Sequence, residues 1–435
     1  MASAERIRQV AEIVKNQLDR RPILVLSAMG DTTDHLLEAA DAALKKGHYK
    51  IDKIEELHLN TIDELKLGDE GTKIISPLLL ELNNLFMGIA LIRELTSRTR
   101  DYLVSFGERL AVRIGAAYFN SIGVKAVAVD AWDGGFCSNS NYTQAELTEE
   151  SWNLIPSRLL PRAEEGILQV LTGFIAKDEN KNITTLGRGG SDLTATMIGA
   201  ACGAEEVQVW KDVDGILTAD PRIVKNAKVV DIISYEAAAE LAYYGAQVLH
   251  PRAMQPCLRT GTPVTVKNSY NPKAPGTRIV KTLGAGKTSP LQAITSRKNV
   301  TLIDIVSSRM LGQHGFLAEV FSRFAKYGVS VDMVATSEVS VSVTLDTSYD
   351  LKGLKNELSQ IASVEIKTGK AIVTIIGDVS RSSEILARSF KVCEQQGVQV
   401  QMISQGASKV NISFIVDDKE ATKVIRSLHE DFFEK

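Results

Sequence analysis

A glycine-rich segment at Thr184–Asp192, TTLGRGGSD, carries the residues best suited to binding an anion. Its glycines allow the backbone to turn tightly and approach a ligand closely, because no Cβ is in the way. Ser191 or Asp192 can cap the helix predicted to follow, so that the first N–H groups of this helix face the loop. Arg188 adds a planar double donor suited to a carboxylate or a phosphate. The segment therefore predicts an anion-binding loop; the alternative is a glycine-rich turn that holds no ligand.

The elements around this segment alternate between helices and apolar strands. Strands are predicted at 22–28, 125–130, 167–174 and 206–210. Helices are predicted at 7–18, 31–46, 51–65, 72–94, 108–122, 193–202 and 234–244, the first of them capped by Ser3. We also read the apolar run just before Gly107 as strand-like. Such alternation predicts an α/β domain with a mostly parallel sheet, which binds ligands beyond the carboxyl ends of its strands.

The composition excludes several classes of protein. At 435 residues the chain is long enough for a large domain and one or two smaller ones. A net charge of −3 gives no reason to expect nucleic acid or a membrane as a partner. The cysteines are far apart and the histidines form no close pair, so we expect reduced thiols and no protein-held metal.

A stretch rich in glycine and small residues at 282–290, TLGAGKTSP, separates the α/β region from an internal repeat. The stretch looks like the end of a phosphate-binding P-loop, but Lys281 occupies the position of the required first glycine, so we interpret it as a linker. The repeat has an offset of 69 residues, and each copy has the predicted order strand, helix, strand, strand. Its matching positions are Leu317 and Leu386, Phe321 and Phe390, Gly328 and Gly397, Val331 and Val400, and Met333 and Met402.

Taken together, these segments resemble those of the aspartate kinases, and most closely the monofunctional plant-type enzymes. The resemblance rests on the segments 25–33, 103–109, 184–196, 209–222, 243–251, 266–277, 334–346 and 402–416. It implies a mostly parallel-sheet amino-acid-kinase domain followed by two ferredoxin-like ACT modules. The expected limits are residues 1–283 for the kinase domain, 284–295 for the linker, and 296–365 and 366–435 for the modules.

The resemblance also implies a reaction. Aspartate kinases transfer the γ-phosphoryl group of ATP to the side-chain carboxylate of L-aspartate, giving 4-phospho-L-aspartate, the first step of lysine, threonine and methionine biosynthesis. A carboxylate with a pKa near ~4 is already ionised at neutral pH, so no general base is required. Catalysis then depends on positioning and on charge neutralisation. Mg²⁺ is expected to arrive with the phosphates of ATP rather than in a cage of protein ligands.

Five positions match the family's aspartate site. Arg188 would hold the α-carboxylate with support from Ser191, and Glu108 would bind the ammonium group. Thr33 would hydrogen-bond near the reacting end, with Ser27 beside it. As alternatives, Glu108 is a solvated helix charge, and Thr33 and Ser27 are ordinary turn residues.

The family's nucleotide site matches positions at and after the carboxyl end of the strand predicted at 206–210. These positions are Lys211, Asp212, Gly215, Leu217, Arg222 and Gln247. Gly215 would allow a tight turn over the base, and Arg222 would reach a phosphate. Many family members carry lysine where this chain has Gln247, and the plant-type enzymes carry glutamine. Asp192 and Lys211 are the expected catalytic residues, although Asp192 could equally be only a helix cap.

The first ACT module is expected to bind the effector lysine. The matching residues are Gly315, Phe316, Leu317, Asp332, Ser337 and Glu338. Asp332 and Glu338 suit an ammonium group, and solvated loop charges are the alternative. Plant-type relatives also suggest S-adenosylmethionine as a ligand. We expect a homodimer through the ACT modules, because exposed sheet edges need covering.

One departure from the family concerns the start of the chain. Family members begin with a strand and a KFGGTS-like turn, whereas this chain starts at Met1, directly after the place of that motif. We expect a truncated sequence; the alternative function is a catalytically impaired, lysine-sensing regulatory subunit. The resemblance suggests the chloroplast stroma, although this chain shows no transit peptide, and a bacterial protein would be cytoplasmic.

Overall fold

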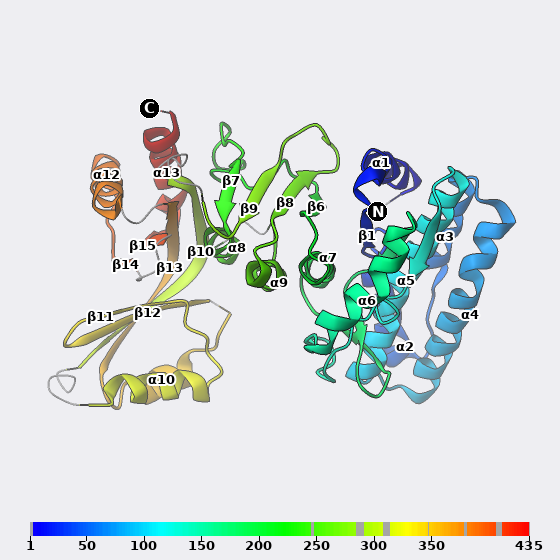
Figure 1. Ribbon diagram of the computed structural model, residues 1–435. Coiled ribbons are helices and arrows are strands. Elements are labelled where there is room, and N and C mark those ends of the chain that lie inside the picture. Colours follow the sequence, from blue (N-terminus) through cyan, green and yellow to red (C-terminus); the bar gives the residue numbers. More distant parts are fainter. Residues whose placement is uncertain are drawn as a thin grey trace. The chain divides into compact units, whose positions relative to one another are not determined.

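The computed structural model describes residues 3–244, 248–283, 291–307, 314–346, 348–377, 381–405 and 411–434 (Figure 1). The chain divides into two compact units. The first combines Met1–Asp214 with Leu249–Lys281, and the second combines Gly215–Val248 with Thr282–Lys435. Gln247 and the P-loop-like 284–290 lie outside the described residues.

The first unit contains the following elements. Its helices are α1 (Ala4–Lys15), α2 (Thr32–Lys46), α3 (Asp52–Glu64), α4 (Gly68–Ile92), α5 (Ser97–Ser121), α6 (Glu150–Glu164), α7 (Gly190–Ala201) and α9 (Pro251–Thr260). Its strands are β1 (Ile23–Leu26), β2 (Ala126–Val129), β3 (Leu168–Thr172), β4 (Ile175–Lys177), β5 (Ile183–Thr185), β6 (Val207–Lys211), β8 (Val264–Asn268) and β9 (Thr277–Val280).

Parallel strands dominate the first unit, which confirms the predicted fold class. β3 pairs in parallel with both β1 and β2, and Leu26 lies opposite Thr172. β6 pairs in parallel with β8, so that Lys211 lies opposite Asn268, and β9 adds an antiparallel strand. α7 packs against both β1 and β6. The carboxyl ends of β1, β3 and β6 therefore lie at the edge where α7 begins, as expected of a ligand-binding edge.

The interpretation of the run before Gly107 as strand-like was wrong. Leu103, Phe106 and Leu110 lie within α5, which packs against β1, β2 and β3 as well as α2 and α4. A helix covered on opposite sides buries residues all round and reads as a continuous apolar run, much like a buried strand. Ser3 caps α1 as predicted, since its hydroxyl accepts a hydrogen bond from the Arg6 N–H group at 3.4 Å.

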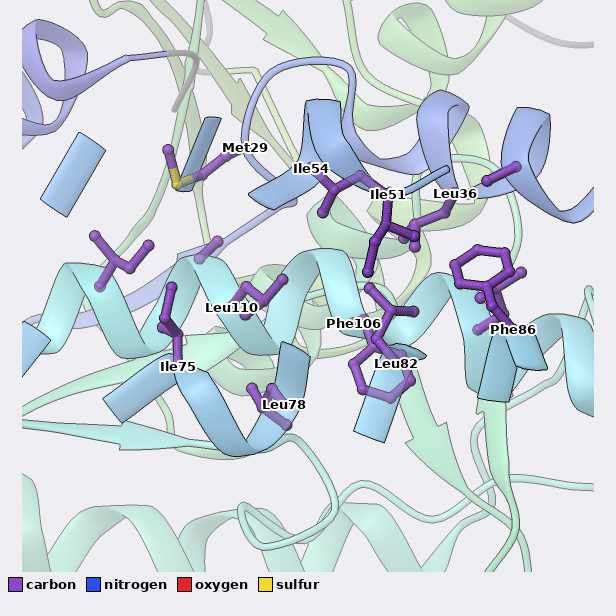
Figure 2. Close-up of a cluster of buried hydrophobic side chains, with 14 of the residues drawn as sticks. Met29, Leu36, Ile51, Ile54, Ile75, Leu78, Leu82, Phe86, Phe106 and Leu110 are labelled. Carbon is purple, nitrogen blue, oxygen red and sulfur yellow. The ribbon is translucent and has the colours of Figure 1, made fainter. Parts of the chain in front are cut away.

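A large apolar cluster fixes α5 between its helical neighbours (Figure 2). Leu82 and Phe86 of α4 and Phe106 of α5 are completely buried in it. α4 is also the one helix in the described residues with the length and composition to cross a membrane. The core helix of a soluble protein meets the same two criteria, and α4 contributes one whole side to this cluster. The expected absence of a membrane partner therefore stays a prediction.

The second unit contains the ACT modules and one segment from within the kinase region. Its elements are β7 (Ile232–Ser234), α8 (Tyr235–Tyr243), β10 (Leu291–Val306), α10 (Phe316–Lys326), β11 (Met333–Thr336), β12 (Ser340–Asp346), α11 (Lys352–Leu358), β13 (Ser363–Gly377), α12 (Ser382–Gln395), β14 (Met402–Ser404), β15 (Asn411–Asp417) and α13 (Asp418–His429).

The two repeat copies share one antiparallel sheet with the strand order β11-β12-β10-β13-β15-β14. The long strands β10 and β13 pair with each other at its centre, so the modules are joined by backbone hydrogen bonds. Each copy has the predicted order of strand, helix, strand and strand, and each adds a further helix, α11 or α13. β10 begins at Leu291, within the expected linker, and the predicted domain limits stay predictions.

The segment at 215–224 packs against the second ACT module. Ala219 and Val224 join the apolar cluster of that module. The Thr218 hydroxyl lies 2.9 Å from Nε2 of His429, and the Thr218 carbonyl accepts a hydrogen bond from the Ile294 N–H group at 2.8 Å. This part of the kinase sequence therefore belongs structurally to the second unit.

Candidate active site

The glycine-rich loop enters α7 through two residues with left-handed backbone. Gly187 has φ 73° and Gly189 has φ 70°, a region that favours glycine. Gly189 is also the N-cap residue, and no side chain caps the helix. Capping by Ser191 or Asp192 was therefore a wrong prediction: both lie inside the first helical turn, and this leaves their side chains available for other contacts.

Neighbouring chain segments hold the loop in place. A Cβ on Gly189 would lie 2.6 Å from the Cβ of His250, so only glycine permits this close approach. The Arg252 guanidinium donates hydrogen bonds to the carbonyls of Leu186, at 2.9 Å, and Ala145, at 2.6 Å. Arg188 itself is exposed at the tip of the loop. Its side chain is thus free to meet a ligand from solvent.

Ser191 lies against the carboxyl end of β3. A Cβ on Gly173, the residue after this strand, would be 2.6 Å from the Cβ of Ser191. The Gly173 N–H group donates to the carbonyl of Leu26, the last residue of β1, at 2.9 Å. The start of α7 and the ends of β1 and β3 therefore form one continuous surface.

Glu108 reaches the same surface from α5. It is 4% exposed, and its Oε1 accepts a hydrogen bond from the Ala28 N–H group at 3.3 Å, while Oε2 has no partner among the described residues. Burial raises the pKa of Glu108 from 4.5 to about 8. Glu108 is therefore not the solvated helix charge of the alternative interpretation. It is a buried carboxyl group that is short of hydrogen-bond donors.

Gly107 explains how α5 can come so close to the residues after β1. A Cβ at this position would lie 2.7 Å from the Cβ of Ala28 and 3.7 Å from the hydroxyl of Thr33. Thr33 is half-buried in the first turn of α2, whereas Ser27 is exposed. The structure thus brings Glu108 and Thr33 together around Ala28.

Lys211 and Asp192 form a bidentate ion pair. The Lys211 ammonium lies 3.0 Å and 2.9 Å from the two carboxylate oxygens of Asp192, and neither side chain is fully exposed. Lys211 ends β6 and Asp192 begins α7, so the pair joins the end of a strand to the glycine-rich loop. Both residues were predicted to be catalytic, but the contact between them was not foreseen.

The remaining residues of the predicted nucleotide site are divided between the two units. Asp212 is exposed directly after β6, whereas Gly215, Leu217 and Arg222 belong to the second unit. Gly215 has φ 142°. The Arg222 side chain is 87% exposed and pairs with Asp220 at 2.7 Å, so it already has an anionic partner in this state.

Sequence reasoning missed two further polar contacts near the site. Asp101 is buried in α5 and accepts hydrogen bonds from the N–H groups of Thr143 and Thr185, at 2.9 Å and 2.8 Å. Asp214 accepts one from the Asn268 side chain at 2.9 Å, beyond the ends of β6 and β8. Asp101 follows Arg98 and Arg100 and looks like an ordinary helix charge, so no sequence signal marked it, while Asp214 lay unremarked inside a quoted motif.

In the first ACT module, the predicted effector residues surround the start of α10 and the turn before β12. Gly315 is the N-cap of α10, Phe316 is buried in the core of the module, and Leu317 is 41% exposed. The Ser337 hydroxyl contacts that of Ser340 at 2.7 Å, and Glu338 is exposed.

Asp332 is not a solvated loop charge. Its side chain is 6% exposed, lies 3.0 Å from Nη1 of Arg297, and accepts a hydrogen bond from the Tyr243 hydroxyl at 2.7 Å. Burial, together with this bond to Asp332, raises the pKa of Tyr243 to about 12, so Tyr243 stays a donor. Because Tyr243 ends α8, the contact ties the 215–248 segment to the first module.

Comparison with known proteins places these features in a family. Residues 1–268 match the amino acid kinase family, and residues 303–355 and 373–432 match the ACT domain. The chain is 50% identical to chloroplastic aspartokinase 1 of Arabidopsis thaliana, over 100% of this chain and 79% of the relative. It is 35% identical to lysine-sensitive aspartokinase 3 of Escherichia coli, over 100% of this chain and 97% of the relative.

Solved structures agree with this relationship. E. coli aspartokinase III in complex with aspartate and ADP has a TM-score of 0.80 at 33% identity, covering 99% of this chain and 97% of that one. The same enzyme in complex with lysine and aspartate also has a TM-score of 0.80, at 34% identity, covering 98% of this chain and 96% of that one. One region of the chain matches the amino acid kinase family, two further stretches match the ACT domain, and an aspartokinase aligns with the whole chain. The chain therefore belongs to the aspartokinase family, the ATP-dependent aspartate kinases.

Proposed function

We propose that this protein transfers the γ-phosphoryl group of MgATP to the side-chain carboxylate of L-aspartate, forming 4-phospho-L-aspartate for the synthesis of lysine, threonine and methionine. The observation that carries the proposal is the meeting of three features at the carboxyl ends of β1, β3 and β6. These are the buried carboxyl of Glu108, the glycine-rich loop, and the Lys211–Asp192 pair.

The chemistry asks for cations and N–H groups rather than for a base. The attacking carboxylate is already ionised, and the main obstacle is its repulsion from the γ-phosphate. Lys211 supplies a positive charge at the end of β6, and Asp192 holds its ammonium group in place. The open N-terminus of α7 adds oriented N–H groups. Catalysis would rest on this preorganised charge.

Mg²⁺ would enter together with the nucleotide. In the described parts of the chain no three acidic, histidine or cysteine side chains cluster as metal ligands. The Asp192 carboxylate is occupied by Lys211, and Asp214 is bonded by Asn268. Such a donor set suits a metal held mainly by phosphate oxygens and water, which Mg²⁺ tolerates.

Glu108 and Arg188 would share the recognition of aspartate. Oε2 of Glu108 has no partner among the described residues, so the ionised carboxylate would lack a donor there, and the ammonium group of an amino acid supplies one. Arg188, exposed on the loop, would hold the α-carboxylate, with Ser191 below it. Ser27 and Thr33 would border the reacting end.

Regulation by lysine would act through the first ACT module. A lysine ammonium at Asp332 would compete with Arg297 and Tyr243 for the same carboxylate, and the E. coli relative binds lysine. Release of Tyr243 would free the end of α8, close in sequence to Gln247. A ligand that favours one arrangement shifts the equilibrium between the two. S-adenosylmethionine as a second effector, a homodimer through the modules, and a chloroplast location complete the proposal.

Arg188→Ala tests the assignment of the aspartate site. Loss of a desolvated bidentate contact costs on the order of 2–4 kcal/mol, so KM for aspartate should rise ~30-fold or more. The measurement is aspartate-dependent ADP release, with ADP affinity determined separately by calorimetry and expected to stay the same. Arg162→Ala, an exposed arginine on α6, is the matched control.

Two outcomes would count against the proposal. If Arg188→Ala lost affinity for ADP and for aspartate equally, the assignment of Arg188 to the aspartate α-carboxylate would be wrong. Absence of turnover in the parent protein, combined with tight lysine binding, would favour the regulatory-subunit alternative.

A further inference from the structure

A cavity separate from the candidate active site lies in the first unit, on the face of α5 that turns toward α4. Its volume is about 500 Å³. Arg98, Thr99, Tyr102 and Arg109 line it from α5, and Glu81 and Leu85 line it from α4. Trp132 and the β4–β5 hairpin complete the wall. None of the residues assigned to aspartate, nucleotide or effector lines it.

The cavity has an excess of positive charge. Arg98, Arg109, Lys177 and Lys181 all line it, whereas Glu81 is its one acidic lining residue. Glu81 is already engaged, because it accepts hydrogen bonds from the Tyr102 hydroxyl and, at 3.3 Å, from Arg109. Within the described ranges, the other three cations have no carboxylate partner. Like charges that converge without counter-charges repel one another, and a bound anion would relieve that repulsion.

Arg109 adds buried donors without acceptors. Its side chain is 11% exposed and lies between the rings of Phe106, at 4.8 Å, and Trp132, at 6.0 Å. Its Nη2 contacts Glu81, but Nε and Nη1 have no partner in the described structure. Buried guanidinium donors are normally satisfied, so two orphaned ones beside a cavity call for an acceptor.

The first turn of α5 also contributes to the cavity lining. Arg98 and Thr99 belong to its first turn and line the cavity. That turn contains no acidic residue and carries Arg98 and Arg100, the reverse of what the helix dipole favours. On β4, the Lys177 ammonium lies 4.2 Å from the centre of the Trp132 ring. Arginines from α5 and lysines from the β4–β5 hairpin thus line one cavity.

We propose that this cavity binds a small anion that carries two or more negative charges, either a phosphate compound or a di- or tricarboxylate. Arg98 from α5 and Lys177 from β4 bind it, and Arg109 turns its free N–H groups toward it. The site is separate from that of aspartate: Glu108 and Arg109 are consecutive on α5 and therefore point about 100° apart around the helix.

Calorimetry on the whole protein tests the proposal. Pyrophosphate, inorganic phosphate and citrate are titrated at constant ionic strength, with saturating ADP present to occupy the proposed nucleotide site. We expect binding of at least one of the three, and the comparison of phosphates with citrate distinguishes the two sources of charge. The fluorescence of Trp132 should change on binding, and Trp132→Phe should abolish this change.

Two double variants that remove the same charge test whether the anion binds in this cavity. Arg98→Gln with Lys177→Gln should weaken anion binding about tenfold or more, because two charge-assisted contacts are lost. Arg162→Gln with Lys125→Gln removes the same charge from exposed positions elsewhere and should leave the affinity unchanged. Equal affinity in both double variants, or no binding of any of the three anions, would overturn the proposal. Aspartate affinity, measured in parallel, should be the same in both, which separates this result from the proposed function.

Discussion

The protonation of Glu108 provides a test of the proposed substrate site. Burial raises its pKa from 4.5 to about 8. In the unfolded chain the carboxyl ionises above its ordinary pKa, whereas in the folded protein it keeps its proton until about pH 8. The folded state therefore binds more protons across this window, and the free energy of unfolding falls as pH rises through it. At 1.36 kcal/mol per pH unit, the loss is at most about 5 kcal/mol.

Glu108→Gln removes this dependence while keeping the shape of the side chain. Urea unfolding at pH 5 and pH 8 gives the free energy of unfolding of both proteins. The parent protein should lose stability relative to the variant as pH rises, by up to a few kcal/mol. If the difference between the two proteins is the same at both pH values, Glu108 is not a buried, protonated carboxyl.

Binding of aspartate should lower the raised pKa of Glu108 again. At pH 7 a carboxyl with a pKa near 8 is about nine-tenths protonated, and the arriving ammonium group favours its ionised form. Aspartate binding should therefore release a proton, and affinity should rise about tenfold between pH 6 and pH 7. Calorimetry in buffers of different ionisation enthalpy counts the protons. Proton release that persists in Glu108→Gln would refute the role of this residue.

Three further predictions concern regulation and packing. Asp332→Ala should relieve inhibition by lysine without changing activity in its absence, whereas Asp346→Ala, on the other side of Arg297, should leave inhibition intact; undiminished lysine binding by Asp332→Ala would contradict the proposed pocket. Asp101→Ala removes the acceptor of three hydrogen bonds and should lower the free energy of unfolding by about 3–5 kcal/mol, because two buried amides lose their partner. Gly107→Ala should weaken aspartate binding, because its Cβ would meet the Cβ of Ala28 at 2.7 Å, beside Glu108. Expressed as free energies, the increase in KM for aspartate from steady-state kinetics should exceed the loss of unfolding free energy measured in urea.

Periodicity predicted the α/β architecture well because most elements of the first unit bury only one side. α2 and α3 follow the helical spacing of their apolar residues, and β1 and β3 are short apolar runs bounded by polar ones. The second half of α5 was predicted as a helix, but the run before Gly107 was misread as strand-like, because burial on opposite sides removes the polar face that marks a helix.

The hairpin of β4 and β5 and the helices α6 and α9 were missed for other reasons. The strands of the hairpin have three residues each, too few for an alternation to show. α6 contains Pro156 and Pro161, which normally argue against a helix. α9 contains Pro256 and is short, so only its cap at His250 marked its start.

The candidate site was predicted as a set of residues rather than as a set of contacts. Motifs singled out Asp192 and Lys211, which are 19 positions apart, and only the packing of α7 on β6 makes them a pair. The same holds for Glu108, which the motif identified and which only the fold shows to be buried. For Asp332 the motif suggested a carboxylate open to a ligand, but it could not reveal that Arg297 and Tyr243 already contact this carboxylate.

α5 is the element on which these arguments converge. It packs against β1, β2 and β3 on one side and against α2 and α4 on the other, so it has little freedom to move. A carboxyl on such a helix is held in place before substrate arrives, and preorganisation of this kind lowers the cost of binding. The same rigidity prevents Glu108 from turning toward water to find donors, so that Oε2 has no partner in the part of the chain that the structure describes, and burial keeps the pKa of the carboxyl high. If Glu108 binds the substrate ammonium as proposed, that contact would offset the cost of burying the carboxyl.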